Sequence, residues 1–502
     1  MSLAAPYFRA SPAPLAAAQG GAATPAVAAL LVFAIVLFSL AVLGDGDTWW
    51  HLKAGEWILR HASVPHEDPF SFSLAGAPWT AHEWLSEALF ALAYHGARWS
   101  GVQLLTAIAA AGAIFILATR LARDVGGLAL AVATTLAASL LAEDLLARPH
   151  VLALPAMAAW CAGLMGARDA GRAPSPLLAP LMALWANLHG GFVFGLALAA
   201  ALALEAVMEA AGEARRQAIK SWGLFGALAL GAALLTPQGV EGLLFPLRLL
   251  ALKSLDQITE WQPATFAKIE PLETAMLGLL FLALWRPIRL PLIRLLLLLG
   301  LVHLSLHHAR HQMLLAVLAP MLLARPLAAA LDAPALPAKR IFGANSAGLA
   351  AVALALALTG MRIALPAKRV DAPGAPISAL AATPAALRAQ PVLNEYGFGG
   401  YLIWAGVRPF IDGRADMYGD AFMERYGRIV APDLAALDEE LARDHIAWTI
   451  FSPGTRIVGA LDAKPGWRRL YADAFAVIHV RDDAPGVGKA DEAGGLRLAS
   501  PE

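Results

Sequence analysis

The sequence has a single cysteine, Cys161, which lies inside an apolar run. One cysteine excludes a framework of disulfides and a metal site built from several cysteines. Charged residues are also scarce. They make up 15% of the chain, and 38 basic side chains balance 38 acidic ones, so the net charge is zero. No basic stripe is available to neutralise the phosphates of a nucleic acid. These shortages exclude a disulfide-stapled fold and argue against a nucleic-acid partner.

Apolar residues, by contrast, dominate the chain. They make up 59% of its 502 residues, and the mean hydropathy is +0.60. Soluble globular chains are usually nearer half apolar and a quarter charged. Repeated apolar runs predict a polytopic α-helical membrane protein, with a transmembrane domain of about 11 helices over residues 24–364. The runs cover residues 24–43, 103–119, 125–142, 149–166, 174–189, 190–208, 221–236, 271–286, 290–306, 310–331 and 344–364.

The distribution of basic residues predicts how these helices are oriented. Arginine and lysine occupy every second connection, and the positive-inside rule makes those connections cytoplasmic. They are Arg120, Arg123, Arg168, Arg172, Arg215, Arg216, Lys220, Arg286, Arg289, Arg325, Lys339 and Arg340. An odd number of spans then places the N-terminus inside and the C-terminal part of the chain outside. Residues 1–23 form an N-terminal tail with Arg9 as its one basic residue, so we interpret the first run as a retained helix rather than a signal peptide.

The composition changes after residue 364. Residues 365–385 are rich in proline and alanine and are predicted to be a linker. Residues 386–485 are predicted to form a small exoplasmic α/β domain, and residues 486–502 a disordered tail. Within the domain we expect the following elements: strands at 391–396, 401–404, 408–412 and 446–451, a helix at 433–444, and a closing hairpin at 467–480.

Residues able to do chemistry gather in the predicted exoplasmic loop at residues 44–102. Its first part, residues 44–87, holds many carboxylates and histidines together with five tryptophans. Tryptophan rings lie at the level of the lipid headgroups, and carboxylates just outside the hydrocarbon can stay ionised. This composition suits a reaction on a lipid-borne substrate. The alternative is a solvated, aromatic-rich interfacial loop.

Three groups in this loop are candidates for catalysis. Asp45 and Asp47 can share a divalent cation or a proton if a turn points them the same way, which Gly46 permits; otherwise the pair simply ends the first span. His51 lies one helical turn beyond Asp47 and can hydrogen-bond that carboxylate or complete a metal site. Glu83 precedes a predicted interfacial helix and is the second acid/base candidate. Whether a metal takes part is left open.

Cations are expected where a lipid phosphate would arrive. Arg148 and Arg310 lie at the exoplasmic ends of predicted spans, and a planar guanidinium can bind phosphate oxygens in a bidentate manner. Snorkelling or helix capping is the alternative for each. His189 lies in a tight exoplasmic turn and is expected to line the same cavity.

Two further groups have more than one interpretation. His303, His307 and His311 recur every four residues and share a helix face, which fits contacts to a donor phosphate, polar packing or a metal site. Asp412 and Arg414 lie in a glycine-flanked loop of the C-terminal domain. They form either an internal salt-bridge network or contacts to the acceptor.

A first span followed at once by an acidic exoplasmic loop resembles the GT-C class of membrane glycosyltransferases. The segment from Gly399-Gly-Tyr-Leu-Ile-Trp404 to Phe410-Ile-Asp-Gly-Arg-Ala-Asp-Met-Tyr-Gly419 is also similar to that of bacterial glycosyltransferase-like polytopic membrane proteins. The resemblance implies a GT-C-like fold in the bacterial inner membrane and a sugar donor carried on a polyprenyl phosphate or diphosphate. It also implies an Asp base in the first exoplasmic loop, where Asp47 matches and Asp45 is the alternative.

We therefore predict an inverting membrane glycosyltransferase that moves a sugar from a lipid-linked donor to a glycan, lipid or protein acceptor at the periplasmic face. Asp47 would be the general base, while Arg148 and Arg310 would stabilise the leaving phosphate. A flippase for lipid-linked glycans is the rival, although transporters often show internal repeats and midplane charges, and here the polar groups gather at one surface. A noncatalytic envelope-assembly subunit is the third possibility. The sequence does not identify the sugar, the acceptor or the carrier.

Overall fold

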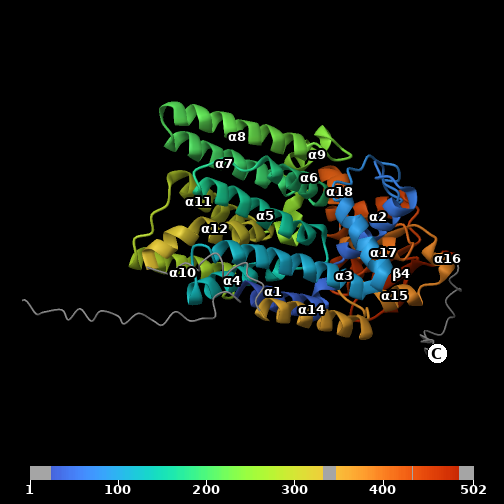
Figure 1. The fold of residues 1–502 in the computed structure, drawn as a ribbon. Helices are drawn as coiled ribbons and strands as arrows, with labels where there is room; N and C mark the ends of the chain where they lie inside the picture. Colours follow the sequence, from blue (N-terminus) through green and yellow to red (C-terminus); the bar gives the residue numbers. More distant parts are fainter. Residues whose placement is uncertain (1–23, 332–345, 432, 486–502) are drawn as a thin grey trace, which may run out of the picture.

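The computed structural model describes residues 24–331, 346–431 and 433–485. The predicted N-terminal tail, the predicted disordered tail and two of the predicted cytoplasmic basic residues, Lys339 and Arg340, lie outside the described residues. The described chain folds into a helical part and a smaller mixed domain at one end of it (Figure 1).

Long apolar helices lying side by side make up the helical part. They are α1 (Thr24–Phe38), α3 (Trp84–Leu121), α4 (Gly127–Leu141), α5 (Pro149–Asp169), α6 (Ala179–Leu188), α7 (Phe192–Glu209), α8 (Gly212–Ala233), α10 (Pro271–Trp285), α11 (Leu292–His307), α12 (Gln312–Leu331) and α14 (Ser346–Ala364). Each overlaps one predicted span. Six stretches of the described chain are long and apolar enough to cross a membrane. The prediction of a polytopic helical membrane protein is therefore confirmed.

Small residues allow the central helices to pack closely. Ala107, Ala110 and Ala113 of α3 are almost completely buried, because alanine lets neighbouring backbones approach. The outer helices instead expose leucines, such as Leu284 of α10 and Leu354 of α14. Without a water-facing polar face, these surfaces are suited to contact with lipid.

At one end of the bundle, a network of ion pairs joins the ends of neighbouring helices. Arg294 of α11 contacts Asp169 of α5 at 2.9 Å and Glu205 of α7 at 3.1 Å. Arg120 of α3 reaches the other oxygen of Asp169 at 2.6 Å, and Arg168 contacts Glu205 at 3.0 Å. These charges neutralise one another at the ends of four helices, which lets them be buried. They lie at the end where the arginine-rich connections begin.

The opposite end carries the loop that joins α1 to α3. The chain leaves α1 through a 3-10 turn (Leu40–Leu43) and enters a short helix, α2 (Asp47–His61). α3 then begins at Trp84 and is kinked at Ala97 and Arg98, where Arg98 has a φ of 52°. The kink divides the predicted interfacial helix from the span that follows it.

The C-terminal domain has a four-stranded sheet with the order β1-β2-β4-β3. Its elements are β1 (Val392–Asn394), β2 (Trp448–Phe451), β3 (Trp467–Ala472), β4 (Val477–Arg481), α15 (Ile377–Ala382), α16 (Ala385–Arg388), α17 (Gly399–Trp404), α18 (Ala415–Val430), α19 (Leu434–Arg443) and α20 (Arg456–Asp462). β1 pairs with β2 in parallel, and the remaining pairs are antiparallel. The predicted helix at 433–444, the last single strand and the closing hairpin are confirmed. Part of the predicted linker, α15, packs into the domain core.

Two predicted strands of this domain are wrong. Residues 401–404 belong to α17, a helix that packs against α2. Residues 408–412 run beside β1 without forming a strand, because the Asn394 side chain, rather than the backbone of a neighbouring strand, hydrogen-bonds to them. It accepts a hydrogen bond from the Phe410 N–H at 2.8 Å and donates one to the Ile411 carbonyl at 2.8 Å. The apolar character of this segment therefore reflects burial rather than strand pairing.

Candidate active site

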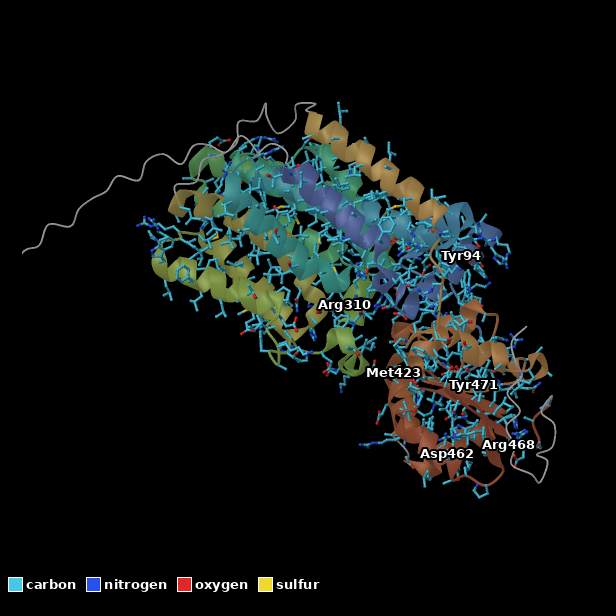
Figure 2. All side chains as sticks on the ribbon, turned by 90° about the horizontal axis from the view of Figure 1, so that it is seen from below. Tyr94, Arg310, Met423, Asp462, Arg468 and Tyr471 are labelled. Carbon is cyan, nitrogen blue, oxygen red and sulfur yellow. The ribbon has the colours of Figure 1, made fainter. Side chains whose placement is uncertain are left out.

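A cavity of about 800 Å³ lies where the bundle meets the C-terminal domain. Its walls come from the loop that joins α1 to α3, from the ends of α5, α6 and α12, from the connection between α9 (Val240–Leu249) and α10, and from α18. Arg310 and Met423 line it from the two sides of this boundary (Figure 2). Titratable residues that line it are Asp45, Asp47, His51, His82, Glu83, Glu87, Glu143, Asp144, Arg148, His150, His189, Glu260, Arg310, His311, Tyr396, Asp416 and Tyr426.

Asp47 is held at the start of α2 by several contacts. Its N–H donates a hydrogen bond of 2.6 Å to Asp45 Oδ1, as in the turn that Gly46 was expected to permit. Its Oδ1 accepts a hydrogen bond of 3.1 Å from Trp50 Nε1, and its Oδ2 lies 3.2 Å from Arg148 Nη2. Burial raises the pKa of Asp47 to about 7, although the Arg148 guanidinium opposes this shift. The carboxyl can therefore exchange a proton near neutral pH.

Glycines of the C-terminal domain lie directly against this turn. A Cβ at Gly46 would be 2.4 Å from the Gly397 carbonyl oxygen, and a Cβ at Gly400 would be 2.2 Å from the Gly46 oxygen. Real Cβ atoms do not come so close to a backbone oxygen. The glycine-rich segment of the C-terminal domain therefore lets two backbones touch beside the candidate base.

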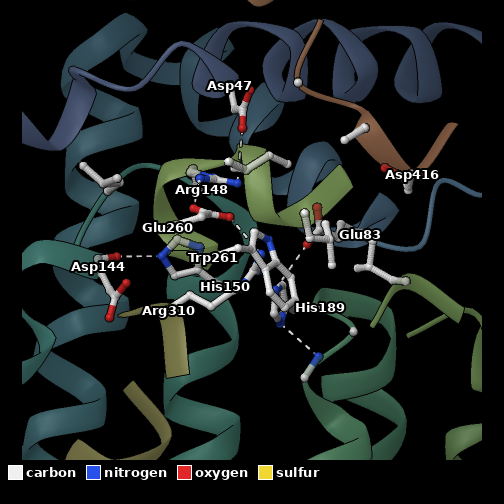
Figure 3. Close-up of a pocket in the computed structure, with 18 of the residues that line it drawn as sticks. Asp47, Glu83, Asp144, Arg148, His150, His189, Glu260, Trp261, Arg310 and Asp416 are labelled. Atoms are coloured by element: carbon white, nitrogen blue, oxygen red, sulfur yellow. Dashed lines mark hydrogen bonds and ion pairs between the residues drawn. The ribbon is translucent and has the colours of Figure 1, made fainter. Parts of the chain in front are cut away.

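Two arginines share one carboxylate on the neighbouring wall. Arg148 Nη1 lies 2.6 Å from Glu260 Oε2, and Arg310 Nη1 lies 2.8 Å from Glu260 Oε1 (Figure 3). Arg148 also reaches Asp45 Oδ2 at 3.6 Å, and Arg310 stacks over the Trp261 ring with 4.4 Å to its centroid. The roles expected for Asp47, Arg148 and Arg310 require the three side chains to line one cavity, and they do. The carboxylate between the two arginines was not expected.

Glu83 faces a group of imidazoles. Its carboxylate lies 3.4 Å from His189 Nε2, 3.7 Å from His82 Nε2 and 4.0 Å from His51 Nε2. His189 Nδ1 accepts the Gly191 N–H at 3.0 Å, so the remaining proton of the neutral ring is on Nε2, facing Glu83. Burial keeps the pKa of His189 well below its ordinary value and raises the pKa of Glu83 to about 7. This wall can hydrogen-bond a polar ligand.

The histidine triplet is divided by the structure. His311 is buried and lines the cavity, whereas His303 and His307 lie on α11 and do not line it. Within residues 24–331, 346–431 and 433–485, no three His, Cys, Asp or Glu side chains are arranged to hold a metal ion. The shared helix face predicted for the triplet therefore brings no set of metal ligands together, because the chain turns at His308, before His311.

Asp412 and Arg414 do not reach the cavity. Arg414 contacts Asp412 and Asp68 at 2.7 Å each, and all three side chains are fully buried. Its guanidinium also stacks over Trp79 with 4.8 Å to the ring centroid. Tyr418 completes the network with a hydrogen bond of 2.8 Å to Asp412. The geometry favours the internal salt-bridge interpretation, since this network fastens the C-terminal domain to the loop that carries Asp47.

Sequence reasoning missed several residues of the site. Glu260 and Trp261 line the cavity from a connection to which no role was assigned. Asp416 lines it from the loop of Asp412 and Arg414, for which contact with the acceptor was one of the two interpretations. His150 also lines it, and its Nε2 lies 2.6 Å from the Asp144 carbonyl oxygen. A signal for Glu260 was present, because Glu260-Trp261 repeats the acidic-aromatic character of the first loop within another predicted exoplasmic connection.

A second, apolar cavity of about 360 Å³ lies beside the first, between α7 and α11. Met157, Trp185, Phe194 and Leu314 line both. Its other lining residues are almost entirely leucine, alanine, isoleucine and glycine from the membrane helices. The cavity that holds the charged groups is therefore adjacent to an apolar one among the membrane helices.

The chain matches no protein-family model and no curated protein. It is similar in fold to the apo oligosaccharyltransferase of Archaeoglobus fulgidus, with a TM-score of 0.55 and 13% identity over 86% of this chain and 70% of that chain. It is also similar to AglB from the same organism in complex with an inhibitory peptide and a dolichol-phosphate, with a TM-score of 0.52 and 12% identity over 86% and 69% of the two chains. ArnT from Cupriavidus metallidurans bound to undecaprenyl phosphate has a TM-score of 0.49 and 13% identity over 91% and 97%. The likeness to the oligosaccharyltransferases shows that the chain has the GT-C fold.

Proposed function

We propose that the protein is a membrane glycosyltransferase that transfers a sugar from a polyprenyl-phosphate-type donor to an envelope acceptor. The observation that carries this proposal is the meeting of Asp47, Arg148 and Arg310 in one cavity. They come from three separate connections of the fold, and together they supply a base and two phosphate-binding cations. The GT-C fold, whose neighbours include complexes with dolichol-phosphate and undecaprenyl phosphate, agrees with this chemistry.

The donor would bind across both cavities. Its phosphate would contact the guanidinium groups of Arg148 and Arg310, since charge-assisted hydrogen bonds from arginine suit phosphate oxygens. Its apolar chain would enter the second cavity, between α7 and α11, whose lining is almost entirely apolar. Binding there would remove the apolar surface of the lipid chain from water. His311, which lines the first cavity and contacts Phe194, a residue of both cavities, would contact the donor near the phosphate.

Asp47 would act as the general base. Its Oδ2 would take the proton of the acceptor hydroxyl while the acceptor oxygen attacks the anomeric carbon. The bond from that carbon to the phosphate oxygen breaks, and the phosphate keeps the electron pair. The configuration at the anomeric carbon is inverted. Because Arg148 turns toward the phosphate, it neutralises Asp47 less, which strengthens the base. General-base catalysis is typically worth about 10²–10⁴-fold.

The other wall would bind the acceptor or the sugar. Asp45 fixes the Asp47 backbone and so positions the base. Glu83, with His189 and His51 close to its carboxylate, offers hydrogen-bonding groups for hydroxyls. Glu83 is also the second candidate for the base, because its pKa is raised to the same region. If a divalent cation takes part, Asp45 and Asp47 would be the residues to hold it.

The reaction would take place at the periplasmic face of a bacterial inner membrane. The basic connections lie at the end of the bundle opposite the cavity, and the positive-inside rule makes that end cytoplasmic. The N-terminus would then be inside, while the loop with Asp47 and the C-terminal domain would both be periplasmic.

A paired measurement tests the proposal. Purified protein in nanodiscs should bind undecaprenyl phosphate, and a host deleted for the gene should lose a sugar from an envelope glycan, as measured by mass spectrometry. Asp47→Asn should bind the lipid like the wild type but fail to restore the sugar. If the wild-type protein binds no lipid phosphate, or if Asp47→Asn restores the glycan fully, the proposal is wrong.

A further inference from the structure

Glu260 occupies the place that a lipid phosphate would take. Its two carboxylate oxygens each pair with a different arginine, Oε2 with Arg148 at 2.6 Å and Oε1 with Arg310 at 2.8 Å. A phosphate group with two free oxygens would make the same pair of contacts. The two arginines are thus already spaced to hold one small anion between them (Figure 3).

The site has no spare positive charge while Glu260 remains there. The Arg148 guanidinium also lies 3.6 Å from Asp45 and 3.2 Å from Asp47. A bound phosphate would add a fourth anionic group to a site that has three carboxylates and only two arginines. Burial alone would raise the pKa of Glu260, but Arg148 and Arg310 lower it to about 2. Glu260 is therefore ionised at any working pH and does not leave by taking up a proton.

We propose that Glu260 is an internal anion that gives up the arginine pair when the donor phosphate binds and takes it back to release the spent lipid phosphate. This inference rests on the proposed function. Glu260 would take part only in the exchange of anions on the arginine pair. Its side chain would neither touch the reacting carbon nor supply a proton.

The charge change of the reaction explains why such a residue is needed. A sugar joined to a polyprenyl phosphate is a phosphodiester with one negative charge. When the bond to the sugar breaks, the lipid becomes a phosphomonoester, which carries about 1.5–2 negative charges near pH 7. The product therefore binds the arginine pair more strongly than the donor does. An anion tethered beside the pair offsets this preference, because it is ready to replace the product.

The exchange requires little movement of the chain. The Trp261 carbonyl oxygen lies 2.6 Å from His308 Nδ1, and the Gln262 carbonyl accepts the Ala309 N–H at 3.1 Å. These contacts hold the backbone next to Glu260 against the turn that carries Arg310. The Glu260 side chain is about 29% exposed, so it has open space to rotate into. In the proposed exchange, a change of the Glu260 side-chain rotamer would free the two arginines.

The test compares three purified full-length variants in nanodiscs for binding and release of undecaprenyl phosphate. Glu260→Gln keeps the shape but removes the charge, so we expect about tenfold tighter binding and slower dissociation of the lipid. Glu260→Asp keeps the charge but cannot reach both arginines, so we expect a smaller gain. Glu241→Gln, at an exposed residue in the first turn of α9, is the matched control and should bind like the wild type.

The outcomes separate the inference from the function on which it rests. If the wild type binds the lipid in an Arg310-dependent manner but Glu260→Gln binds equally or more weakly, Glu260 merely orients the arginines and the inference is overturned. If neither protein binds the lipid, the proposed donor is wrong and the inference falls with it. Tighter binding by Glu260→Gln with unchanged melting temperature supports the exchange.

Discussion

Gly413 lies against the carboxylate of Asp47. A Cβ at Gly413 would be 1.9 Å from Asp47 Oδ1 and 2.9 Å from Trp50 Nε1, the group that donates to the same oxygen. The C-terminal domain therefore forms part of the wall that fixes the candidate base, although Gly413 and Asp47 are far apart in the sequence. A domain that looks like an appendage in the sequence is part of the site.

Gly413→Ala should consequently impair turnover more than stability. The added methyl group must displace either the Asp47 carboxylate or the Trp50 indole, and a misplacement of about 1 Å at a catalytic group can cost about 10²-fold. We expect kcat to fall strongly with little change in undecaprenyl phosphate binding. Gly459→Ala is the control, since a Cβ there meets nothing within 4 Å. Equal activity of the two variants would show that the contact does not position the base.

Arg414→Gln should destabilise the protein rather than weaken substrate binding. The substitution leaves Asp412 and Asp68 buried without their cation, and breaking a buried pair costs about 3–5 kcal/mol. Thermal unfolding in detergent measures the loss. Arg481→Gln, which breaks an exposed pair with Asp483, should cost less than about 1 kcal/mol. A stable Arg414→Gln protein with weakened acceptor use would instead return Arg414 to the binding site.

The membrane helices could be predicted from the sequence because each one depends mainly on the apolar residues of its own segment. An apolar run of sufficient length forms a helix wherever backbone groups have no water to bond, so each predicted span overlaps a helix. The C-terminal domain was harder. The segment 408–412 is short and apolar like a buried strand, and nothing in its own residues reveals that the Asn394 side chain, rather than a neighbouring strand, takes up its hydrogen bonds.

Site residues could be predicted only where a charged side chain also lies at a predicted end of a membrane span. Asp47, Arg148 and Arg310 could be proposed because each is a charge at the predicted exoplasmic end of a span. Glu260 was missed because its place in the site depends on its ion pairs with Arg148 and Arg310, which come from other connections of the chain. Arg414 was ambiguous for the same reason, since its partner Asp68 is distant in the sequence.

The predicted orientation can be tested by cysteine labelling, because the native Cys161 is buried. Ser63 and Gly454 are exposed on the loop and on the C-terminal domain, and Ser175 is exposed at the opposite end of the bundle. Ser63→Cys and Gly454→Cys should react with an impermeant maleimide in intact spheroplasts, whereas Ser175→Cys should react only after permeabilisation. Opposite labelling of the first two would contradict the shared periplasmic location.

Arg310→Lys should weaken donor binding even though the charge is kept. An ammonium cannot reproduce the planar fork or the stacking of the guanidinium over Trp261 at 4.4 Å. We expect the affinity for undecaprenyl phosphate to fall by about tenfold, which corresponds to the loss of a charge-assisted hydrogen bond. Arg248→Lys, in an exposed pair with Glu241, is the matched control. Unchanged binding in Arg310→Lys and Arg310→Ala would leave Arg310 with a role in helix capping only.

The pH dependence of turnover should identify the base. Burial raises the pKa of Asp47 to about 7 against the opposing charge of Arg148. Below that pH the carboxyl is protonated and cannot accept a proton, so kcat/KM should fall about tenfold per pH unit as the pH decreases and level off above about 7.

Two substitutions separate the candidates for this titration, since the pKa of Glu83 is raised to the same region. Asp47→Asn should lower turnover by about 10² or more and abolish the acid limb, because the amide cannot take up the proton. Glu83→Gln should retain the limb while weakening acceptor use. Asp45→Asn should cost less than Asp47→Asn, and adding a chelator to the wild type checks whether a cation bridges the two carboxylates. If the limb disappears in Glu83→Gln and persists in Asp47→Asn, the base is Glu83, and Asp47 serves to hold Arg148 in place.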